Sequence, residues 1–345
     1  MPRRVVFRSY GGAENLQVET VADPVARRGE VVVDTAFAGV NYADVIARRG
    51  FYKWAPPPPT CVGFEISGVV SALGEGVNSL QLGDRVMGVT RFGGYADRLL
   101  LEAERAWKVP TAMSLEDAAA IPAVYLTAWH SLCEVARVRA GESVLIQAVA
   151  GGVGLAALQL CKHHGLVTYG TASSEDKLAL ARSHGLDHGI DYATRDFEEA
   201  IHTATSGRGV DVVLDSLGGE GLRKGYRCLA RGGRVVTIGA AQVAPTARNP
   251  IALARAGIAL LRGGLFHPFQ LIEDNRGIAG VQVLLLWDDL PHLRRGLDEI
   301  LSLYAAGKVR PVIDSIHPLE DAAVAHRKLE TRASKGKLLL RCAGS

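Results

Sequence analysis

The sequence predicts an α/β protein in which a doubly wound parallel sheet follows a β-rich first third. Three observations predict this. From about Val144 onward, short apolar runs alternate with helical segments of about ten residues. The first of these runs ends in a glycine-rich turn that leads directly into an apolar-periodic segment. Before Ser114, short apolar runs are instead bounded by Gly, Asp or Pro. Alternating strands and helices imply right-handed βαβ units and a parallel sheet, whereas short apolar runs bounded by Gly, Asp or Pro indicate a β-rich region.

The first third contains several expected strands and the first expected helix. Strands are predicted at 31–33, 68–72 and 85–89. The block Pro56–Pro59 is predicted to be an exposed, extended loop, because proline donates no backbone hydrogen bond and fixes its own φ. Ser114 and Asp117 are spaced as a capping box before an alanine-rich helix, and Pro122 disturbs the helical pattern soon afterwards.

The alternating part is predicted to contain strands at 144–148, 167–171, 189–190, 210–214 and 234–238, with helices at 153–164, 175–184 and about 222–229. Near the end of the sequence, 319–329 is predicted to be a helix and 337–341 a strand.

The turn after the strand at 144–148 has the features of a dinucleotide-binding loop. Ala148, Gly151 and Gly154 occupy the three key positions of A-x-x-G-x-x-G, a relative of G-x-G-x-x-G. Small residues there allow a tight turn, close approach of a pyrophosphate, and packing of the helix on its strand. The helix that begins near Val153 would direct unpaired N–H groups toward phosphate. A glycine-rich turn that merely connects strand to helix is the alternative, but the surrounding pattern favours a bound dinucleotide.

Composition excludes several classes of function. With 345 residues, 48% hydrophobic and 22% charged residues, the chain is long enough for two domains of an ordinary globular enzyme. A net charge of +3 does not indicate binding to nucleic acid or a membrane surface. The first residues lack the apolar run of a signal peptide, and the later apolar stretches are too short or carry arginine, so no membrane-spanning segment is expected. Five scattered cysteines are expected to be free thiols in a reducing, cytoplasmic compartment.

Several motifs together resemble the medium-chain dehydrogenase/reductase superfamily, on its zinc-free quinone oxidoreductase side. They are Ala38–Asp44, Gly63–Gly68, Gly83–Met87, Ala150–Gly154, Asp215–Gly219 and Gly232–Gly239. A narrower likeness to the vesicle amine transport protein homologues rests on Gly170–Ser173, Ile190–Tyr192, Lys224–Tyr226 and Arg248–Arg255. The resemblance covers essentially the whole chain. It implies a GroES-like catalytic domain formed by residues 1–122 and 311–345, with a Rossmann NADPH-binding domain at 123–310.

The residues at the expected metal positions argue against zinc. Zinc-dependent relatives have Cys and His where this chain has Gly39 or Val40 beside Asn41 and, further on, Phe64. A phenyl ring cannot ligate a metal, and no cysteine cluster is present for a structural zinc. Glu65 keeps its place, and its alternative role is a structural carboxylate paired with an arginine. No metal is therefore expected.

The end of the second predicted strand favours NADPH over NADH. NAD-preferring Rossmann domains place an acid there, on the ribose hydroxyls, whereas this chain has Ser173. By the resemblance, Lys177 and Tyr192 hold the 2′-phosphate, and Ser173 donates a hydrogen bond. The counter-evidence is the pair Glu175 and Asp176, which is otherwise explained as a charged first helical turn with a capping box between Ser173 and Asp176.

The resemblance also places residues at the reacting centre. Asn41 is expected near the nicotinamide and its ribose, with Thr127 on the nicotinamide side and Gly239 on the far side. Ala150, Gly151, Gly152, Val153, Gly154 and Leu217 complete the expected cofactor contacts. Some quinone reductases carry a tyrosine where this chain has Ile46, so the proton donor stays open between Tyr42, Tyr52 and solvent water.

The expected function is an NADPH-dependent, zinc-independent reductase that transfers hydride to a small apolar quinone or α,β-unsaturated carbonyl. A pathway-specific enoyl reductase is one alternative. A cofactor-binding protein with little catalysis, acting through lipid or protein contacts, is another. The apolar segment Ile251–Leu286 is expected to form a homodimer surface, with part of it covering the substrate cleft.

Overall fold

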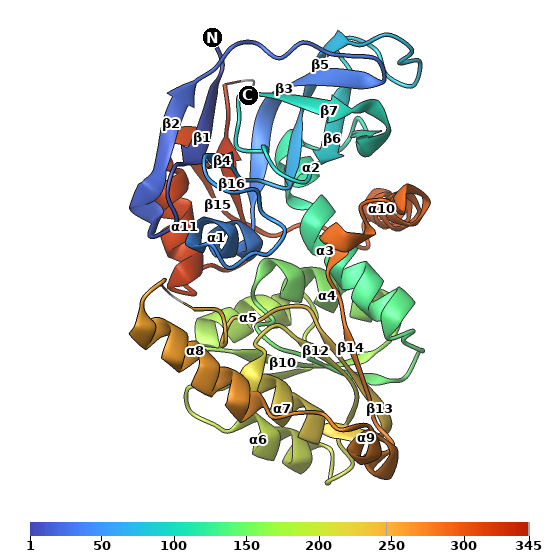
Figure 1. The fold of residues 1–345 in the computed structure, drawn as a ribbon. Coiled ribbons are helices and arrows are strands. Elements are labelled where there is room, and N and C mark those ends of the chain that lie inside the picture. Colours follow the sequence, from blue (N-terminus) through green and yellow to red (C-terminus); the bar gives the residue numbers. More distant parts are fainter. Residues whose placement is uncertain (246, 344–345) are drawn as a thin grey trace. The chain divides into compact units, whose positions relative to one another are not determined.

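The computed structural model describes residues 1–245 and 247–343, and the chain folds into two compact units. One unit consists of Met1–Ala123 together with Pro311–Ser345, and the other of Val124–Arg310. Because the first unit is made from both ends of the chain, the second is an insertion between them (Figure 1).

The inserted unit contains a six-stranded sheet in which every neighbouring pair is parallel, in the order β11-β10-β9-β12-β13-β14. Its strands are β9 (Ser143–Ile146), β10 (Val167–Ala172), β11 (His188–Asp191), β12 (Val210–Asp215), β13 (Leu229–Thr237) and β14 (Gly277–Gly280). The predicted doubly wound parallel sheet is confirmed. The strand order reverses between β9 and β12, and such a switch point is where open α/β sheets bind ligands.

Helices cover both faces of this sheet (Figure 1). They are α4 (Gly152–His163), α5 (Glu175–Ser183), α6 (Phe197–Ala204) and α7 (Gly219–Arg227). Further along the chain, α8 (Pro250–Gly263) packs on α7, and α9 (Pro268–Asp274), 3₁₀ turn η4 (Val283–Leu286) and α10 (Leu290–Ala305) follow. Apolar residues from strands and helices, such as Leu145, Ile201 and Val213, are buried between them. The helix predicted at about 222–229 begins and ends earlier, because residues from Leu229 onward already pair with β12.

The other unit is rich in β-strands, as predicted for the first third, and its sheets are mainly antiparallel. The larger sheet has the order β15-β16-β3-β5-β6-β8, with β7 also paired to β3, and the smaller one has the order β2-β1-β4. The strands are β1 (Arg3–Phe7), β2 (Leu16–Thr20), β3 (Glu30–Val40), β4 (Thr60–Cys61), β5 (Glu65–Leu73), β6 (Arg85–Val89), β7 (Arg98–Glu102), β8 (Ala106–Lys108), β15 (Ile313–Pro318) and β16 (Lys337–Arg341). Strand β16 pairs with β3, so that Leu338 lies opposite Val40. Strand β16 therefore lies beside the segment that leads into Asn41.

The helical segments of this unit are η1 (Ala13–Asn15), α1 (Tyr42–Arg49), η2 (Ala103–Arg105), α2 (Leu115–Ala120), η5 (Leu319–Asp321) and α11 (Ala322–Glu330). Helix α3 (Pro122–Trp129) begins here and continues into the inserted unit, where a π-helical turn at His130–Val135 follows it. The Ser114 hydroxyl accepts the Asp117 N–H at 3.0 Å, which confirms the predicted cap of α2. The prolines Pro56–Pro59 lie in a loop, as predicted.

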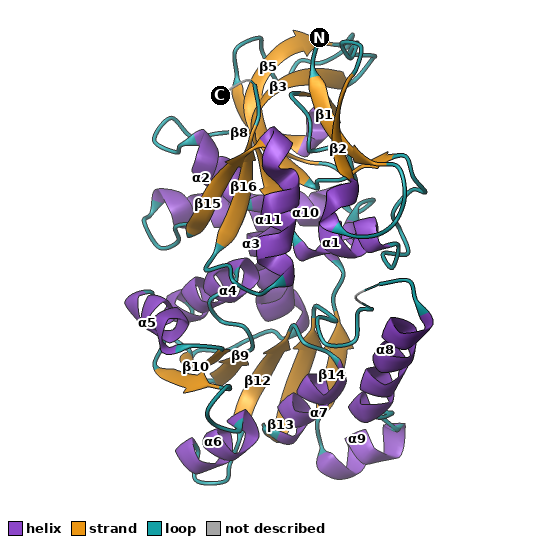
Figure 2. Cartoon of the chain, turned by 90° about the vertical axis from the view of Figure 1, so that its left-hand side faces the viewer, coloured by secondary structure: helices purple, strands orange, loops and turns teal. Residues whose placement is uncertain are grey.

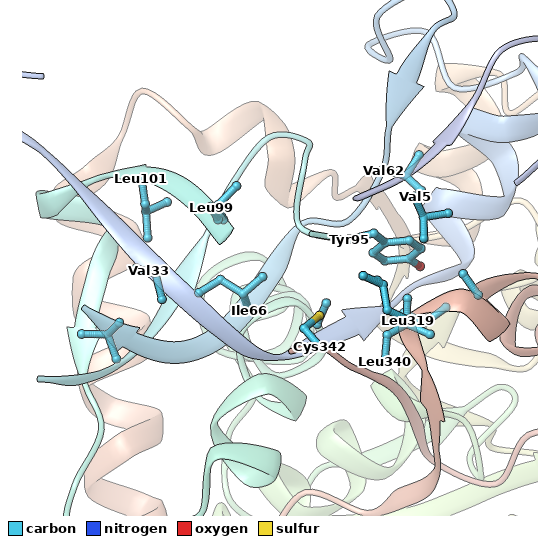
Figure 3. Close-up of a cluster of buried hydrophobic side chains, with 14 of the residues drawn as sticks. Val5, Val33, Val62, Ile66, Tyr95, Leu99, Leu101, Leu319, Leu340 and Cys342 are labelled. Atoms are coloured by element: carbon cyan, nitrogen blue, oxygen red, sulfur yellow. The ribbon is translucent and has the colours of Figure 1, made fainter. Parts of the chain in front are cut away.

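Buried apolar side chains from strands far apart in sequence form the core of this unit. Figure 3 shows Val33 and Ile66 from β3 and β5 beside Leu99 and Leu101, and Tyr95 near Leu319 and Leu340. Figure 2 distinguishes the strands of each sheet from the surrounding helices. Over the described part of the chain, no helix combines the length and apolar character needed to cross a bilayer.

Candidate cofactor and substrate site

The glycine turn at 148–154 follows β9 and leads into α4 in a conformation that small residues permit. Ala148 has φ +51°, a left-handed conformation that costs a residue with a side chain about 1 kcal/mol or more. The Gly151 N–H donates to the Ala148 carbonyl at 2.9 Å. A Cβ added at Gly154 would lie 2.5 Å from the Ala148 oxygen and 2.6 Å from the Val149 oxygen. Only glycine therefore fits at 154 without a backbone shift.

The N-terminus of α4 is available for an anion. Its N-cap is Gly151, which has no side chain to accept the first backbone N–H groups. A Cβ at Gly151 would meet only the Ala148 oxygen, at 3.3 Å. Uncapped N–H groups at the positive end of a helix bind phosphate in many nucleotide sites, and the predicted residues Ala150, Gly152 and Val153 belong to this turn.

The second strand of the sheet brings Ser173 and Tyr192 to the same edge as this turn. Strand β10 ends at Ala172, whose carbonyl accepts the Tyr192 N–H at 3.0 Å. The Thr171 carbonyl accepts the Val149 N–H, also at 3.0 Å. Tyr192 is 37% exposed, and Lys177 lies in the first turn of α5.

The predicted capping box between Ser173 and Asp176 is wrong. The N-cap of α5 is Ser174, and its side chain makes no capping hydrogen bond. The strand ladder runs on to Ala172, so the turn needs one more residue before the helix begins. Of the two acids that argue against a phosphate at this edge, Glu175 pairs with Arg182 of the same helix.

Beyond the switch point, Asp215 holds the loops that carry Leu217 and Gly239. Its buried carboxylate accepts the Leu217 and Gly218 N–H groups, each at 3.1 Å, and the Thr237 hydroxyl at 2.7 Å. Burial raises the pKa of this carboxyl, although the three donors favour its charged form. A Cβ at Gly239 would lie 2.8 Å from the Ser216 carbonyl oxygen, so the two loops approach closely.

Thr127 belongs to α3 and is half-buried. Its carbonyl accepts the Ser131 hydroxyl at 2.6 Å. Thr127 and the cofactor-binding candidates of the glycine turn lie in the inserted unit, whereas Asn41 lies in the other.

In that other unit, Asn41 is the centre of a buried polar cluster with Glu65 and Lys337. The Asn41 amide donates from Nδ2 to Glu65 Oε1 at 2.9 Å and accepts from Lys337 Nζ at Oδ1 at 2.6 Å. Lys337 also pairs with Glu65, and the Ala123 N–H donates to Glu65 Oε2 at 2.6 Å. Glu65 is fully buried and Lys337 only 3% exposed. The predicted partner of Glu65 was an arginine; the cation is instead Lys337, brought in by β16 because that strand pairs with β3.

Asp44 fixes the backbone around this cluster. Its two carboxylate oxygens accept the Asn41 N–H at 2.8 Å and the Gly63 N–H at 2.9 Å, and the Tyr95 hydroxyl donates to it at 3.0 Å. Complete burial raises the pKa of Asp44 to about 7. Asp44 therefore ties the Asn41 loop to the segment that leads into Glu65.

The two candidate tyrosines have different surroundings. Tyr42 is the half-buried first residue of α1. The ring of Tyr52 lies 5.4 Å from that of Trp54 and 5.9 Å from that of Phe64, which in turn contacts Phe92. Phe64 is thus a packing residue of an aromatic cluster at the position where zinc-dependent relatives carry histidine.

The structure brings the predicted residues together in two groups and adds three that sequence reasoning missed. Asp44, Asp215 and Lys337 are buried or nearly so, and each orients a predicted site residue. A signal existed for Asp215, which directly follows an apolar strand, and for Asp44, which ends the motif Ala38–Asp44. Lys337 had no local signal, because its partners are about 270 and 300 positions away in sequence.

Comparison with known proteins agrees with this architecture. Residues 27–111 match the alcohol dehydrogenase GroES-like domain, and residues 184–340 match a family described as zinc-binding dehydrogenase. The synaptic vesicle membrane protein VAT-1 homologue of Danio rerio is 36% identical over 98% of this chain and 69% of its own length, and the Homo sapiens protein of that name is 36% identical over 98% and 86%.

The chain belongs to the medium-chain dehydrogenase/reductase superfamily. Within it, the chain lies in the branch of the VAT-1 homologues. Among solved structures, the Escherichia coli quinone oxidoreductase complexed with NADPH superposes with a TM-score of 0.86 at 30% identity, covering 98% of this chain and 99% of that one. The CurK enoyl reductase gives 0.85 at 27% identity, with 99% of each chain covered. The family is one of oxidoreductases, and its GroES-like and Rossmann-like parts correspond to the two units described above.

Proposed function

We propose that this protein is an NADPH-dependent, zinc-independent reductase that transfers hydride to a quinone or an α,β-unsaturated carbonyl. The observation that carries the proposal is the edge of the parallel sheet where the glycine turn, Ser173 and Tyr192 meet. No acid follows β10 directly, and Lys177 lies in the first turn of the next helix. The quinone oxidoreductase complexed with NADPH supports this choice of cofactor.

The residues of the inserted unit fit a dinucleotide. The N–H groups of the turn formed by Ala150, Gly151, Gly152, Val153 and Gly154 would bind the pyrophosphate, since no side chain caps them. Lys177, Tyr192 and Ser173 would bind the 2′-phosphate, because an ammonium and hydroxyl donors suit a dianion. Leu217, Gly239 and Thr127 would border the nicotinamide end. When bound, the cofactor supplies the hydride.

Asn41 would orient and polarise the acceptor carbonyl. An amide nitrogen has two hydrogens, and Glu65 accepts only one of those of Asn41. Lys337 holds the amide oxygen, which prevents the side chain from flipping. The remaining N–H can therefore donate to an oxygen that becomes negatively charged as hydride arrives. The proton would come from Tyr42, Tyr52 or water.

Two features near Asn41 suit a site that works without zinc. Phe64 has no lone pair to offer a metal, and its ring is held in an aromatic cluster. The Lys337 ammonium, beside Glu65, would also repel a divalent cation. Metal analysis of the purified protein should find no stoichiometric zinc.

A second candidate function is that of an enoyl reductase acting on a conjugated acyl thioester. It is favoured by the similarity to the CurK enoyl reductase. We also propose that the protein is a homodimer. The segment Ile251–Leu286 is the candidate interface because its part beyond α8 exposes Leu265, Phe269 and Ile272 with 95%, 69% and 72% of their surface.

Oxidation of NADPH and of NADH should be followed with benzoquinone, phenanthrenequinone, an enone and an enoyl thioester as acceptors. We expect turnover with NADPH and a quinone or enone. Turnover with the thioester alone would favour the enoyl reductase. Tight NADPH binding without turnover of any acceptor would instead favour a cofactor-binding protein with little catalysis.

A further inference from the structure

A pocket of about 430 Å³ lies between α7 and α8, which run side by side in both views of the fold (Figures 1 and 2). It is lined by Glu220, Gln242, Arg255, Ile258, Ala259 and Arg262. Helix α8 is anchored closely here, because a Cβ at Gly263 would lie 3.0 Å from the Gly219 Cα. The volume is within the range of sites for small molecules.

The wall formed by α8 combines two cations with an apolar surface. Arg255 and Arg262 are seven residues apart, so they lie two turns apart on one face of the helix, with Ile258 and Ala259 between them. Neither guanidinium forms an ion pair with any residue that the structure describes, and both are exposed. These arginines thus have unused hydrogen-bond donors beside an apolar surface.

Gln242 adds a further donor on the opposite side. Its Oε1 accepts the Gly221 N–H at 3.0 Å, which fixes the orientation of the amide and leaves the Nε2 hydrogens available. Glu220 is the only carboxylate among the lining residues. The donors therefore outnumber the acceptors, which suits an anionic ligand.

The surrounding sequence strengthens this preference. Residues 221–272 contain no Asp or Glu and eight basic residues: Arg223, Lys224, Arg227, Arg231, Arg234, Arg248, Arg255 and Arg262. Lys224, Arg227 and Arg234 pair with acids outside this stretch. A local excess of one charge raises the concentration of oppositely charged ligands and speeds their association.

We propose that this pocket binds the acidic group of an organic anion, with its apolar part against Ile258 and Ala259, and that this anion is the substrate. The pocket is tied to the proposed cofactor site, because the Gln242 N–H donates to the Leu217 carbonyl at 2.8 Å. Only the statement that the anion is the substrate rests on the proposed reductase function. The substrate class is then a quinone or enone that carries a carboxylate, sulfonate or phosphate.

Binding is tested without cofactor or turnover, by calorimetric titration with 2-naphthoate and its neutral analogue 2-naphthylmethanol. We expect naphthoate to bind at least tenfold more tightly to the wild type. The variant R255M/R262M keeps the aliphatic stems and should lose that preference. The control R137M/R139M removes two exposed arginines of the same unit that lie outside this stretch, and it should retain the preference. Equal affinity of the wild type for naphthoate and naphthylmethanol would show that the pocket does not bind the acidic group. The same conclusion would follow if R255M/R262M kept the preference for naphthoate and had an unchanged melting temperature.

Turnover identifies the anion as substrate. 4-Phenylbut-3-en-2-one and its para-carboxy derivative should be compared as acceptors, with the expectation that R255M/R262M raises KM about tenfold for the acid alone. Arginine-dependent naphthoate binding without NADPH oxidation by either enone would contradict the proposed reductase function and support the anion-binding pocket. If both enones are turned over and R255M/R262M changes KM equally for the two, the pocket does not bind the acidic group of the substrate, and the proposed reductase function is supported. Arginine-dependent binding to phosphatidylserine vesicles, with no binding of naphthoate, would show that the site binds a lipid headgroup. This result would contradict the proposal that the pocket binds a free anionic substrate.

Discussion

The glycine turn of the inserted unit and the Asn41–Glu65–Lys337 cluster of the other unit form their sites in opposite ways. The turn uses backbone N–H groups, and the residues that shape it lie within seven consecutive positions. The cluster uses side chains from β5, β16 and the start of α1, which the sheet brings together. A site made from the backbone of neighbouring residues can be predicted from the sequence, and a substitution that adds a side chain to it should disrupt it. A site made from side chains that are distant in sequence cannot be predicted in this way, and a substitution that removes one of its charges should disrupt it.

The largest expected effect concerns the turn itself. Gly154→Ala should destabilise the protein by about 3 kcal/mol and abolish cofactor binding, because the new Cβ would lie 2.5 Å from the Ala148 oxygen. The matched variant Gly151→Ala, whose Cβ would meet its nearest atom at 3.3 Å, should fold with a loss of at most about 1 kcal/mol. Urea unfolding and NADPH fluorescence titration measure the two effects. Equal stability of the two variants would show that the turn adjusts freely.

The cluster should respond to loss of its cation almost as strongly. Lys337→Met leaves the fully buried Glu65 carboxylate without its counter-ion, which should cost about 3 kcal/mol of unfolding free energy. The double variant E65Q/K337M removes both charges and should recover most of that stability by urea unfolding. Activity should stay low in both variants, because Asn41 loses the donor to its amide oxygen. Full activity in the refolded double variant would exclude Lys337 from positioning Asn41.

The buried groups next to the cluster predict two pH dependences of opposite sign. Asp44 has its pKa raised to about 7 from 3.8, so the folded state binds its proton more tightly, and stability is lost as the pH rises from about 4 to 7. His326, whose Nε2 lies 3.2 Å from the Tyr95 hydroxyl, has its pKa lowered by burial to about 3, so stability is lost as the pH falls below 6.5.

Denaturation of Asp44→Asn and His326→Gln across this pH range separates the two groups. The unfolding free energy of Asp44→Asn minus that of the wild type should rise by at most about 1.4 kcal/mol per pH unit between pH 4 and 7. For His326→Gln the corresponding difference should rise as the pH falls from 6.5. Absolute stability falls in both variants because hydrogen bonds are lost, so the slope is the readout. Parallel profiles for the wild type and both variants would contradict the two assignments.

A smaller effect is expected at the edge of the parallel sheet. Lys177→Ala should weaken NADPH binding about tenfold and leave NADH binding nearly unchanged, since only NADPH has the 2′-phosphate. Lys308→Ala removes an exposed lysine of the same unit and serves as the control. Calorimetric or fluorescence titration with both cofactors gives the ratio. An equal loss of affinity for NADPH and NADH would show that Lys177 does not contact the 2′-phosphate.

The smallest expected effect concerns the aromatic neighbours of the cluster. Tyr52→Phe should keep kcat within about threefold, because the ring packing against Trp54 and Phe64 is preserved and water can supply the proton. Tyr42→Phe is the companion variant, and steady-state kinetics over a range of pH measures both. A hundredfold loss of kcat in either, with one limb of the pH profile missing, would identify that tyrosine as the general acid.

Particular residues show how far sequence reasoning reached. The parallel sheet, the cap at Ser114 and the turn around Gly151 were predicted correctly, because each depends on residues that are neighbours in the chain. The capping box at Ser173 was wrong by one residue. Its position depends on how far β10 pairs with β11, which is a property of the sheet rather than of the helix start.

The sequence alone determined the conformation of the glycine turn and the absence of an acid directly after β10. Ala148, Gly151 and Gly154 permit the tight turn after β9, and the residue that follows β10, Ser173, is not an acid. These properties follow from side-chain size and charge at single positions. Only the tertiary structure decided which groups surround Asn41. The pairing of β16 with β3 buries Lys337 beside Glu65, and a buried charge is stable only next to its partner. That partner is set by strand pairing over almost 300 residues, and no local pattern records it.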